Sequence, residues 1–185
     1  MSTLAPTPGQ TVGPFFGYAL PFDGGAELVP PGHPRAIRLQ GKVFDGAGQP
    51  IPDALVELWQ ADENGTVAQV EGSRARDGWT FTGFGRTPVD DTGHYSFTTL
   101  RPGATEPGRA PFFAITVFAR GLLHRLCTRA YLPLDGDAVA ADPLLSTVPR
   151  DRRATLIVRP DEHGFVFDIR LQGPGETVFL DFGDR

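Results

Sequence analysis

Three arginines within ten residues, Arg120, Arg125 and Arg129, are the side chains whose type and spacing could do chemistry in this sequence. They lie beside a strongly apolar segment, residues 112–118. A guanidinium group presents a planar fork of N–H donors that matches the shape of a carboxylate. The three arginines therefore predict a site for an anion, and the alternative is a solvated or salt-bridged edge of a sheet.

The other reactive side chains form no recognisable constellation. No two of the four histidines are spaced to put two ligands on one face of a strand or a helix: His33, His94, His124 and His163. A single cysteine, Cys127, cannot build a zinc site, and its apolar–polar surroundings favour an inert, buried thiol. Phosphate-binding, metalloprotease and serine-hydrolase motifs are absent from the sequence.

Composition and charge exclude several classes of function. The net charge is −5 and Lys42 is the only lysine, so the sequence does not favour nucleic-acid binding. It contains no apolar run long enough for a membrane span, and residues 1–10 lack the pattern of a secretory signal. One cysteine excludes an internal disulfide and fits a reducing compartment, so we expect the cytoplasm.

The elements that must position these side chains are predicted to be short strands. Glycine and proline make up more than a fifth of the 185 residues, which favours tight turns over helices. About eight short strands are predicted, most of them from alternation of apolar and polar residues and one from the strongly apolar run 112–118. They lie near 37–43, 54–59, 95–99, 112–118, 125–132, 155–158, 165–171 and 178–182, with a further short strand inside 66–92. A short helix is predicted after Asp142, a capping residue followed by proline. This pattern predicts an all-β fold, a β-sandwich with long loops.

The first 35 residues differ from the rest of the chain. They are rich in proline and glycine, so we expect an extended arm and no helix, yet they carry many apolar side chains. A solvated tail would be less apolar, so the arm is expected to lie on its own domain or on another chain. The predicted organisation is an N-terminal arm, 1–35, and a single sandwich domain, 36–185.

Several stretches match one family in order and in spacing. Residues 7–16 read TPGQTVGPFF, and residues 41–45 with 50–62 read GKVFD and PIPDALVELWQAD. These segments resemble the N-terminal signature and the core motif of the intradiol ring-cleaving dioxygenases. The resemblance continues through 83–86, 91–97, 101–103, 117–131, 142–144 and 167–182. The later segments look most like the α chain of the two-chain members that act on protocatechuate.

The resemblance also implies which positions correspond to the metal ligands of the family. Its catalytic chain holds ferric iron with two tyrosines and two histidines. The matching positions in this sequence are Val67, Thr105, Phe112 and Ala114. None of these side chains can offer a phenolate or an imidazole to Fe(III). The resemblance therefore implies that this chain has no catalytic residue and holds no metal.

A partner is implied in consequence. The family's two-chain members pair a non-catalytic α chain with a β chain that carries Fe(III), in a higher oligomer of αβ protomers. The pair cleaves 3,4-dihydroxybenzoate with O2 to give 3-carboxy-cis,cis-muconate. By resemblance, the arm residues Thr11, Gly13, Pro14 and Phe15 are expected to help wall the partner's substrate pocket. Arg129 is expected to face the anionic substrate, with Arg125 as the alternative.

Two other hypotheses account for less of the sequence. Transthyretin-like and carboxypeptidase-regulatory-like sandwich modules share part of the core motif and bind without chemistry. They are shorter, and they leave residues 1–35 and 117–131 unexplained. A self-sufficient catechol dioxygenase would need all four ligands.

Overall fold

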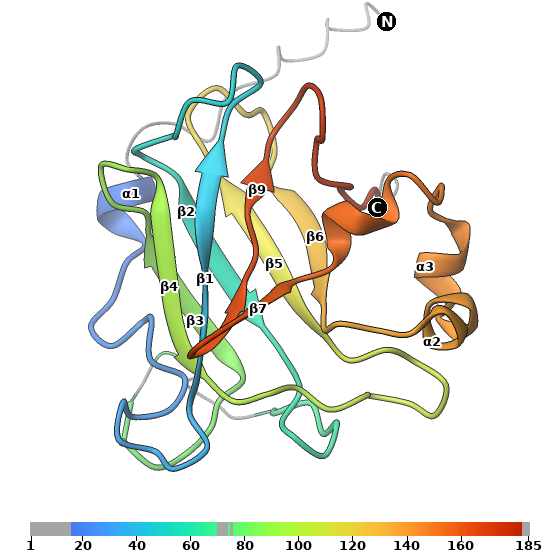
Figure 1. Cartoon of the computed structure of the whole chain (residues 1–185). Helices are drawn as coiled ribbons and strands as arrows, with labels where there is room; N and C mark the ends of the chain where they lie inside the picture. The colour runs from blue at the N-terminus through green and yellow to red at the C-terminus, as the bar shows by residue number, and fades with distance from the viewer. Residues whose placement is uncertain (1–15, 70–73, 75, 183–185) are drawn as a thin grey trace, which may run out of the picture.

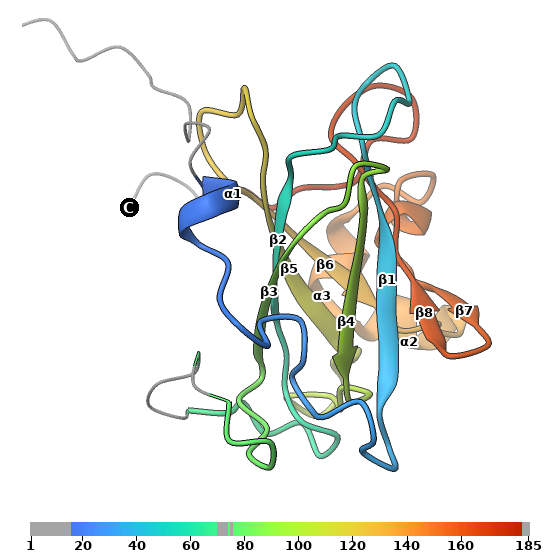
Figure 2. The ribbon, with the colours of Figure 1, turned by 90° about the vertical axis from the view of Figure 1, so that its left-hand side faces the viewer.

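Two sheets face each other in the computed structural model, which describes residues 16–69, 74 and 76–182 (Figure 1). The first sheet has the strand order β4-β1-β8-β7, from His94–Thr99, Ile37–Phe44, Gly164–Val166 and Arg159–Asp161, and β9, Ile169–Arg170, also pairs with β1. The second has the order β3-β2-β5-β6, from Phe84–Pro88, Leu55–Trp59, Phe112–Phe118 and Leu126–Tyr131. The predicted β-sandwich is confirmed, and Figure 2 shows its two layers edge-on.

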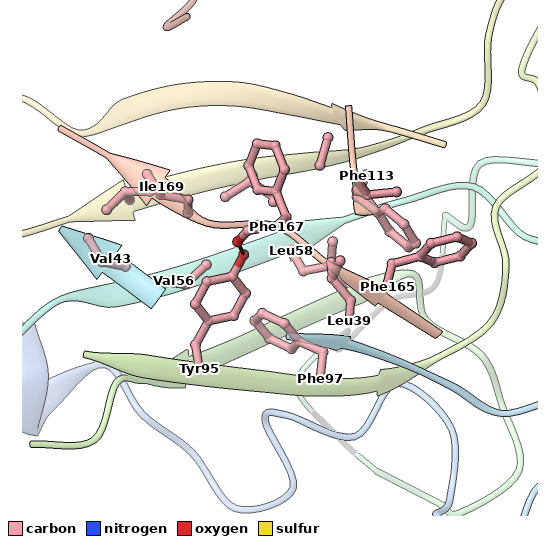
Figure 3. Close-up of a cluster of buried hydrophobic side chains, with 14 of the residues drawn as sticks. Leu39, Val43, Val56, Leu58, Tyr95, Phe97, Phe113, Phe165, Phe167 and Ile169 are labelled. Carbon is pink, nitrogen blue, oxygen red and sulfur yellow. Dashed lines mark hydrogen bonds between the residues drawn. The ribbon is translucent and has the colours of Figure 1, made fainter. Parts of the chain in front are cut away.

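The core lies between the two sheets because apolar side chains alternate along the strands. In β1 every second residue from Leu39 is buried, and in β5 the same holds from Phe113. These side chains meet those of β4 and of the segment that joins β8 to β9, among them Phe97 and Phe167 (Figure 3). Burial of this apolar surface is the main force that holds the layers together.

One glycine in β1 is required by a close approach. Gly41 lies opposite Tyr95 in the β1–β4 ladder. A Cβ atom on Gly41 would meet the carbonyl oxygen of Phe167, and it would lie 3.1 Å from the hydroxyl of Tyr95. The missing side chain therefore leaves the space through which Tyr95 reaches Phe167 (Figure 3).

In the described residues, helix is confined to short pieces outside the sandwich. The helix predicted after Asp142 is α3, Pro143–Thr147, and the Asp142 side chain accepts hydrogen bonds from the N–H groups of Leu144 and Leu145. α2, Gly136–Ala141, was not predicted, although Asp135 caps it in the same way. Both helices lie outside β6 (Figure 1). The expectation of no helix before residue 36 is wrong for α1, Phe16–Ala19, because the segment between Pro14 and Pro21 is free of proline.

Three predicted strands differ from the structure. The first two of residues 155–158 end a 3-10 turn, η1, Arg153–Leu156, and the next one, Ile157, forms a single bridge to Tyr131. The segment 165–171 divides into β8 and β9 because the Asp168 side chain takes the N–H of Lys42 in place of a ladder bond. Residues 178–182 form no strand: the N–H of Leu180 bonds to β6, but the carbonyl of Val178 accepts from a threonine side chain instead of a backbone amide.

Both edges of the four-stranded sheet bond to segments that are not strands. On the β3 edge, the N–H of Arg86 donates to the carbonyl oxygen of Gly25 at 2.8 Å. On the β6 edge, the N–H of Leu180 donates to the carbonyl oxygen of Cys127 at 2.7 Å, and that of Val158 donates to Tyr131 at 2.9 Å. These bonds satisfy backbone groups that an edge strand otherwise leaves open.

Residues 16–35 pack on the sandwich of their own chain. Leu28 and Val29 are buried, and Phe16 packs against Phe118 with ring centroids 6.5 Å apart. Arg86 fixes the same segment, since its guanidinium donates to the carbonyl oxygen of Leu20 at 2.8 Å. The division into an arm and a sandwich remains a prediction, because residues 1–15 lie outside the described part of the chain.

Candidate functional site

The candidate site lies on the outer face of the four-stranded sheet, the face turned away from the core between the two sheets, where Phe112 and Tyr131 join a second hydrophobic cluster. Residues directly opposite each other in a ladder point to the same face. Ala114 on β5 lies opposite both Trp59 on β2 and Arg129 on β6. Phe112, two residues earlier, lies opposite Tyr131. Their neighbours along β5 point inward and are buried, so these five side chains share the outward face.

The structure brings the four predicted lost-ligand positions to one end of this sheet. Phe112 and Ala114 lie on the same face of β5. Val67 forms a bridge with Ala61, which follows β2 two residues after Trp59, and its side chain is 55% exposed. Thr105 lies in the loop before β5, which contacts the turn preceding Val67 through the hydrogen bond from the N–H of Gly103 to the carbonyl oxygen of Asp62.

Arg129 points over the aromatic ring at one of these positions. Its guanidinium carbon lies 4.0 Å from the centroid of the Phe112 ring, closer than the 5.2 to 6.0 Å of the other guanidinium–ring contacts described. Nη1 of Arg129 also donates to the hydroxyl oxygen of Tyr131 at 3.2 Å. The half-buried guanidinium is thus held from two sides, by a π face and by a phenol.

A buried carboxylate stands behind this arrangement. The hydroxyl of Tyr131 donates to Oδ1 of Asp142 at 3.3 Å, and both residues are buried. Oδ1 also accepts the two N–H groups at the start of α3, and Oδ2 accepts the N–H of Ala110 at 3.1 Å. Burial raises the pKa of Tyr131, and the neighbouring Arg129 opposes this rise. The phenol therefore keeps its proton at neutral pH and can donate to Asp142 while accepting from Arg129.

Comparison with known proteins identifies the family. The family described as Dioxygenase matches residues 12–110. The protocatechuate 3,4-dioxygenase alpha chain of Burkholderia cepacia is 39% identical over 98% of this chain and 100% of its own length. The chain belongs to the intradiol dioxygenase family.

Two further members of the family extend this finding. The protocatechuate 3,4-dioxygenase beta chain of Burkholderia cepacia is 34% identical, over 76% of this chain and 66% of its own length. Among solved structures, the dioxygenase domain of a dioxygenase carbohydrate-binding protein fusion from Streptomyces sp. SirexAA-E aligns with a TM-score of 0.59. It is 26% identical, and the alignment covers 92% of this chain and all of that domain. The predicted family membership and fold are therefore confirmed.

The side chains at the four lost-ligand positions do not fit ferric iron. Proteins hold iron through imidazole, carboxylate, thiolate or phenolate donors, and these four positions offer two hydrocarbons, a methyl group and one hydroxyl. Across residues 16–69, 74 and 76–182, no group of three or more His, Cys, Asp or Glu side chains could hold a metal ion. A cation bound beside Phe112 would also meet the positive charge of Arg129. The side chains at these four positions therefore provide no ligand set for ferric iron.

The three arginines singled out in the sequence do not form one cluster. Arg120 pairs with Asp53, with Nε and Oδ2 2.6 Å apart, and it is largely exposed. For this residue the salt-bridged edge is the correct interpretation. Arg125 is exposed in the loop before β6, next to the exposed His124. Arg129 is the arginine that lies on the face with the lost-ligand positions.

Sequence reasoning missed the link from Arg129 to Asp142. Asp142 carried a signal, since its place before Pro143 predicted a helix cap. Its second role depends on Tyr131 and Ala110, which are 11 and 32 residues away in the sequence. The expected pocket residues Thr11, Gly13, Pro14 and Phe15 lie outside the described residues, so their role stays a prediction.

A hollow of about 560 Å³ lies away from this site. It is on the other sheet, beside Arg38, Thr98 and His163, and does not include Arg129. Among the described residues, no helix is long and apolar enough to cross a membrane.

Proposed function

We propose that this chain is the non-catalytic α chain of a protocatechuate 3,4-dioxygenase. It works beside a β chain that carries Fe(III), and the pair cleaves 3,4-dihydroxybenzoate with O2 to 3-carboxy-cis,cis-muconate. The observation that carries the proposal is the match to the Burkholderia cepacia alpha chain over the whole length of that chain. The residues at positions 67, 105, 112 and 114 support it, since they provide no donor set for the iron.

This chain contributes part of the wall and a positive charge to the partner's substrate pocket. Thr11, Gly13, Pro14 and Phe15 of the arm wall the pocket, and Arg129 attracts the carboxylate of the substrate. A guanidinium–carboxylate hydrogen bond in a poorly solvated site contributes about 1.5–3 kcal/mol. This interaction favours protocatechuate over catechol, which lacks the carboxylate.

Arg129 is favoured over Arg125 for this role because of its setting. The guanidinium of Arg129 is half-buried and stacked on Phe112, so less side-chain entropy is lost when it binds an anion. Arg125 lies exposed in a loop, where water screens its charge.

The proposed assembly is a hetero-oligomer of αβ protomers in the cytoplasm. A beta chain exists among the relatives, which supports a β partner. The single cysteine supports a reducing compartment.

The test is to purify this chain alone and together with its β chain, and to measure iron content, visible absorption and O2 consumption with protocatechuate. We expect the chain alone to be colourless, iron-free and inactive, and the pair to be coloured and active. Ferric iron and catechol turnover in the chain alone would contradict the proposal. An iron-free chain that finds no partner would favour a binding module instead.

The substrate-facing arginine is tested in the same complex. Arg129→Gln is expected to raise KM for protocatechuate about tenfold or more, in line with the loss of a charge-assisted bond, and to leave catechol nearly unaffected. Arg125→Gln is the matched control because it removes the same charge from the preceding loop. The reverse pattern would assign the role to Arg125.

A further inference from the structure

The aromatic ring at one of the predicted lost-ligand positions lies against the guanidinium of Arg129. By the resemblance, Phe112 takes the place of a histidine of the family's catalytic chain, and the centroid of its ring lies 4.0 Å from the guanidinium carbon of Arg129. A ring face attracts a cation and restricts its motion. The substitution that removes an imidazole donor therefore also supplies a platform for a positive charge.

Tyr131 holds the guanidinium from the strand that carries it. It lies two residues after Arg129 on β6 and opposite Phe112 on β5. Its hydroxyl oxygen accepts from Nη1 of Arg129 at 3.2 Å. The ring of Tyr131 also packs against that of Phe112, with centroids 5.6 Å apart. The two aromatic residues are thus in contact with each other and with the same guanidinium.

Asp142 anchors Tyr131. The carboxylate accepts the Tyr131 hydroxyl and three backbone N–H groups, those of Ala110, Leu144 and Leu145. It cannot move without breaking the start of α3. Because the carboxylate orients the phenol hydrogen toward itself, a lone pair of the phenol oxygen stays available to Arg129.

The residues that the structure describes cover the Arg129 side chain only in part. Ala114, the residue directly across from Arg129, ends at a methyl group, and Arg129 is only half-buried. Its stack on Phe112 and one N–H bond to Tyr131 leave further N–H donors of the guanidinium for an anion.

We infer that Phe112 and Tyr131, anchored by Asp142, are positioning residues that hold the Arg129 guanidinium ready for the carboxylate of the substrate. The inference rests on the proposed function of Arg129. It adds that recognition of the carboxylate depends on a preorganised set of side chains at the position of a lost ligand.

The kinetic test uses the αβ complex with protocatechuate and catechol as paired substrates. Phe112→Leu keeps an apolar side chain and removes the ring, and Tyr131→Phe removes the hydroxyl alone. Each is expected to raise KM for protocatechuate about three- to tenfold, with kcat and the catechol constants changed less than about twofold. Phe112→Tyr keeps a ring face and is expected to retain the parental KM. Arg120→Gln, at an exposed ion pair, serves as the charge control.

Coupling to Arg129 separates a positioning role from a merely structural one. In an Arg129→Gln background, Phe112→Leu and Tyr131→Phe are expected to cause no further rise in KM for protocatechuate. Additive effects would overturn the inference, because they would show that the two residues act without the guanidinium. The inference would also be overturned if Arg129→Gln raised KM while Phe112→Leu and Tyr131→Phe left it unchanged. That result would leave the proposed function of Arg129 intact.

A spectroscopic measurement covers the case in which the proposed function fails. The Nε–H resonance of Arg129 in the full chain alone is expected to show an upfield ring-current shift that disappears in Phe112→Leu and persists in Phe112→Tyr. If Arg129→Gln leaves the preference for protocatechuate intact, the proposed role of Arg129 is wrong whatever this resonance shows. If the shift is absent in the parent chain, the positioning geometry itself is wrong.

Discussion

The hydroxyl group of Tyr95 donates a 2.6 Å hydrogen bond to the carbonyl oxygen of Phe167, across the strand that lies between them. Tyr95 comes from β4 and Phe167 from the segment between β8 and β9, and both elements flank β1 (Figure 3). The bond thus joins three neighbouring parts of one sheet through a side chain. It passes over Gly41, where a Cβ atom would meet Phe167.

Gly41→Ala is the first prediction from this contact. The new methyl group would clash with the Phe167 carbonyl oxygen, so β1 and the β8–β9 segment must separate. We expect a loss of about 3 kcal/mol in the free energy of unfolding, the upper end of the usual cost of overpacking. Urea unfolding followed by fluorescence measures it. Gly32→Ala is the control, because its Cβ would meet nothing within 4 Å. Equal stability of the two variants would contradict the close approach.

The same contact predicts a dependence on alkaline pH. Burial, and to a lesser extent Asp168, raise the pKa of Tyr95 above its usual value. The folded chain therefore keeps a proton that the unfolded chain loses above about pH 10. The contribution of Tyr95 to stability is complete below that pH and declines as pH rises toward the raised pKa of the folded state.

Tyr95→Phe tests this pH dependence. At pH 7 the variant is expected to lose about 1–2 kcal/mol, because the Phe167 carbonyl loses its buried donor. Above pH 10 the gap between the two proteins should narrow, since the variant has no phenol to ionise at this position. Urea midpoints at pH 7, 9 and 10.5 measure it. A stability difference between the two proteins that stays constant or widens with pH would contradict the raised pKa of Tyr95.

The ion pair between Arg86 and Glu57 fixes the N-terminal segment on the outer face of the sheet. Nε of Arg86 donates to Oε1 of Glu57 at 2.8 Å, and the two side chains are only 15% and 12% exposed. Arg86→Met is expected to cost about 3 kcal/mol or more, because it leaves a nearly buried carboxylate unpaired. It also removes the bond to the carbonyl of Leu20, so we expect faster proteolysis near residue 20.

The control for this ion pair is Arg120→Met. Arg120 is 69% exposed and pairs with Asp53, so its loss is expected to cost less than about 1 kcal/mol. Thermal unfolding and limited chymotrypsin digestion, which cuts after aromatic residues such as Tyr18, compare the two variants. The proposed anchoring fails if the two substitutions cost the same.

Restoring two histidines is predicted not to restore a metal site. In the double variant Phe112→His with Ala114→His, positions 67 and 105 still lack phenolates, and Arg129 still carries a positive charge beside the new ligands. We expect no tyrosinate–iron colour and no iron retained after gel filtration. Visible spectra and metal analysis measure this. A red-brown protein would show that the ligand positions are assigned wrongly.

The strands on either side of the core were predictable because the pattern of apolar residues within each segment indicates a strand. Residues 37–43 alternate apolar and polar side chains, and they lie within β1. Residues 178, 180 and 182 are also apolar at every second position, yet this segment forms no strand. Alternation shows which side of a segment is apolar, but not whether a neighbouring backbone is free to pair with it. At β6 the side chain of Thr128 takes the carbonyl of Val178 that a ladder would have used.

The candidate site was predictable only in part. The resemblance named Phe112 as a lost ligand and Arg129 as a substrate-facing residue, but it gave no reason to connect them. Their contact follows from the register of β5 with β6, which places Arg129 opposite Ala114 and next to the Phe112–Tyr131 pair. Register is a property of two segments together, so neither segment reveals it alone.

The hydrogen bonds at the rims of the four-stranded sheet limit how this chain can associate. Gly25 occupies backbone groups on one rim, and Val158 and Leu180 occupy groups on the other. At these places a neighbouring chain cannot add a strand, so the sheet is protected against fibre growth by edge-to-edge pairing. Another chain that contacts this sheet must then use its outer face or its loops. Such a contact joins two chains without an exchange of strands.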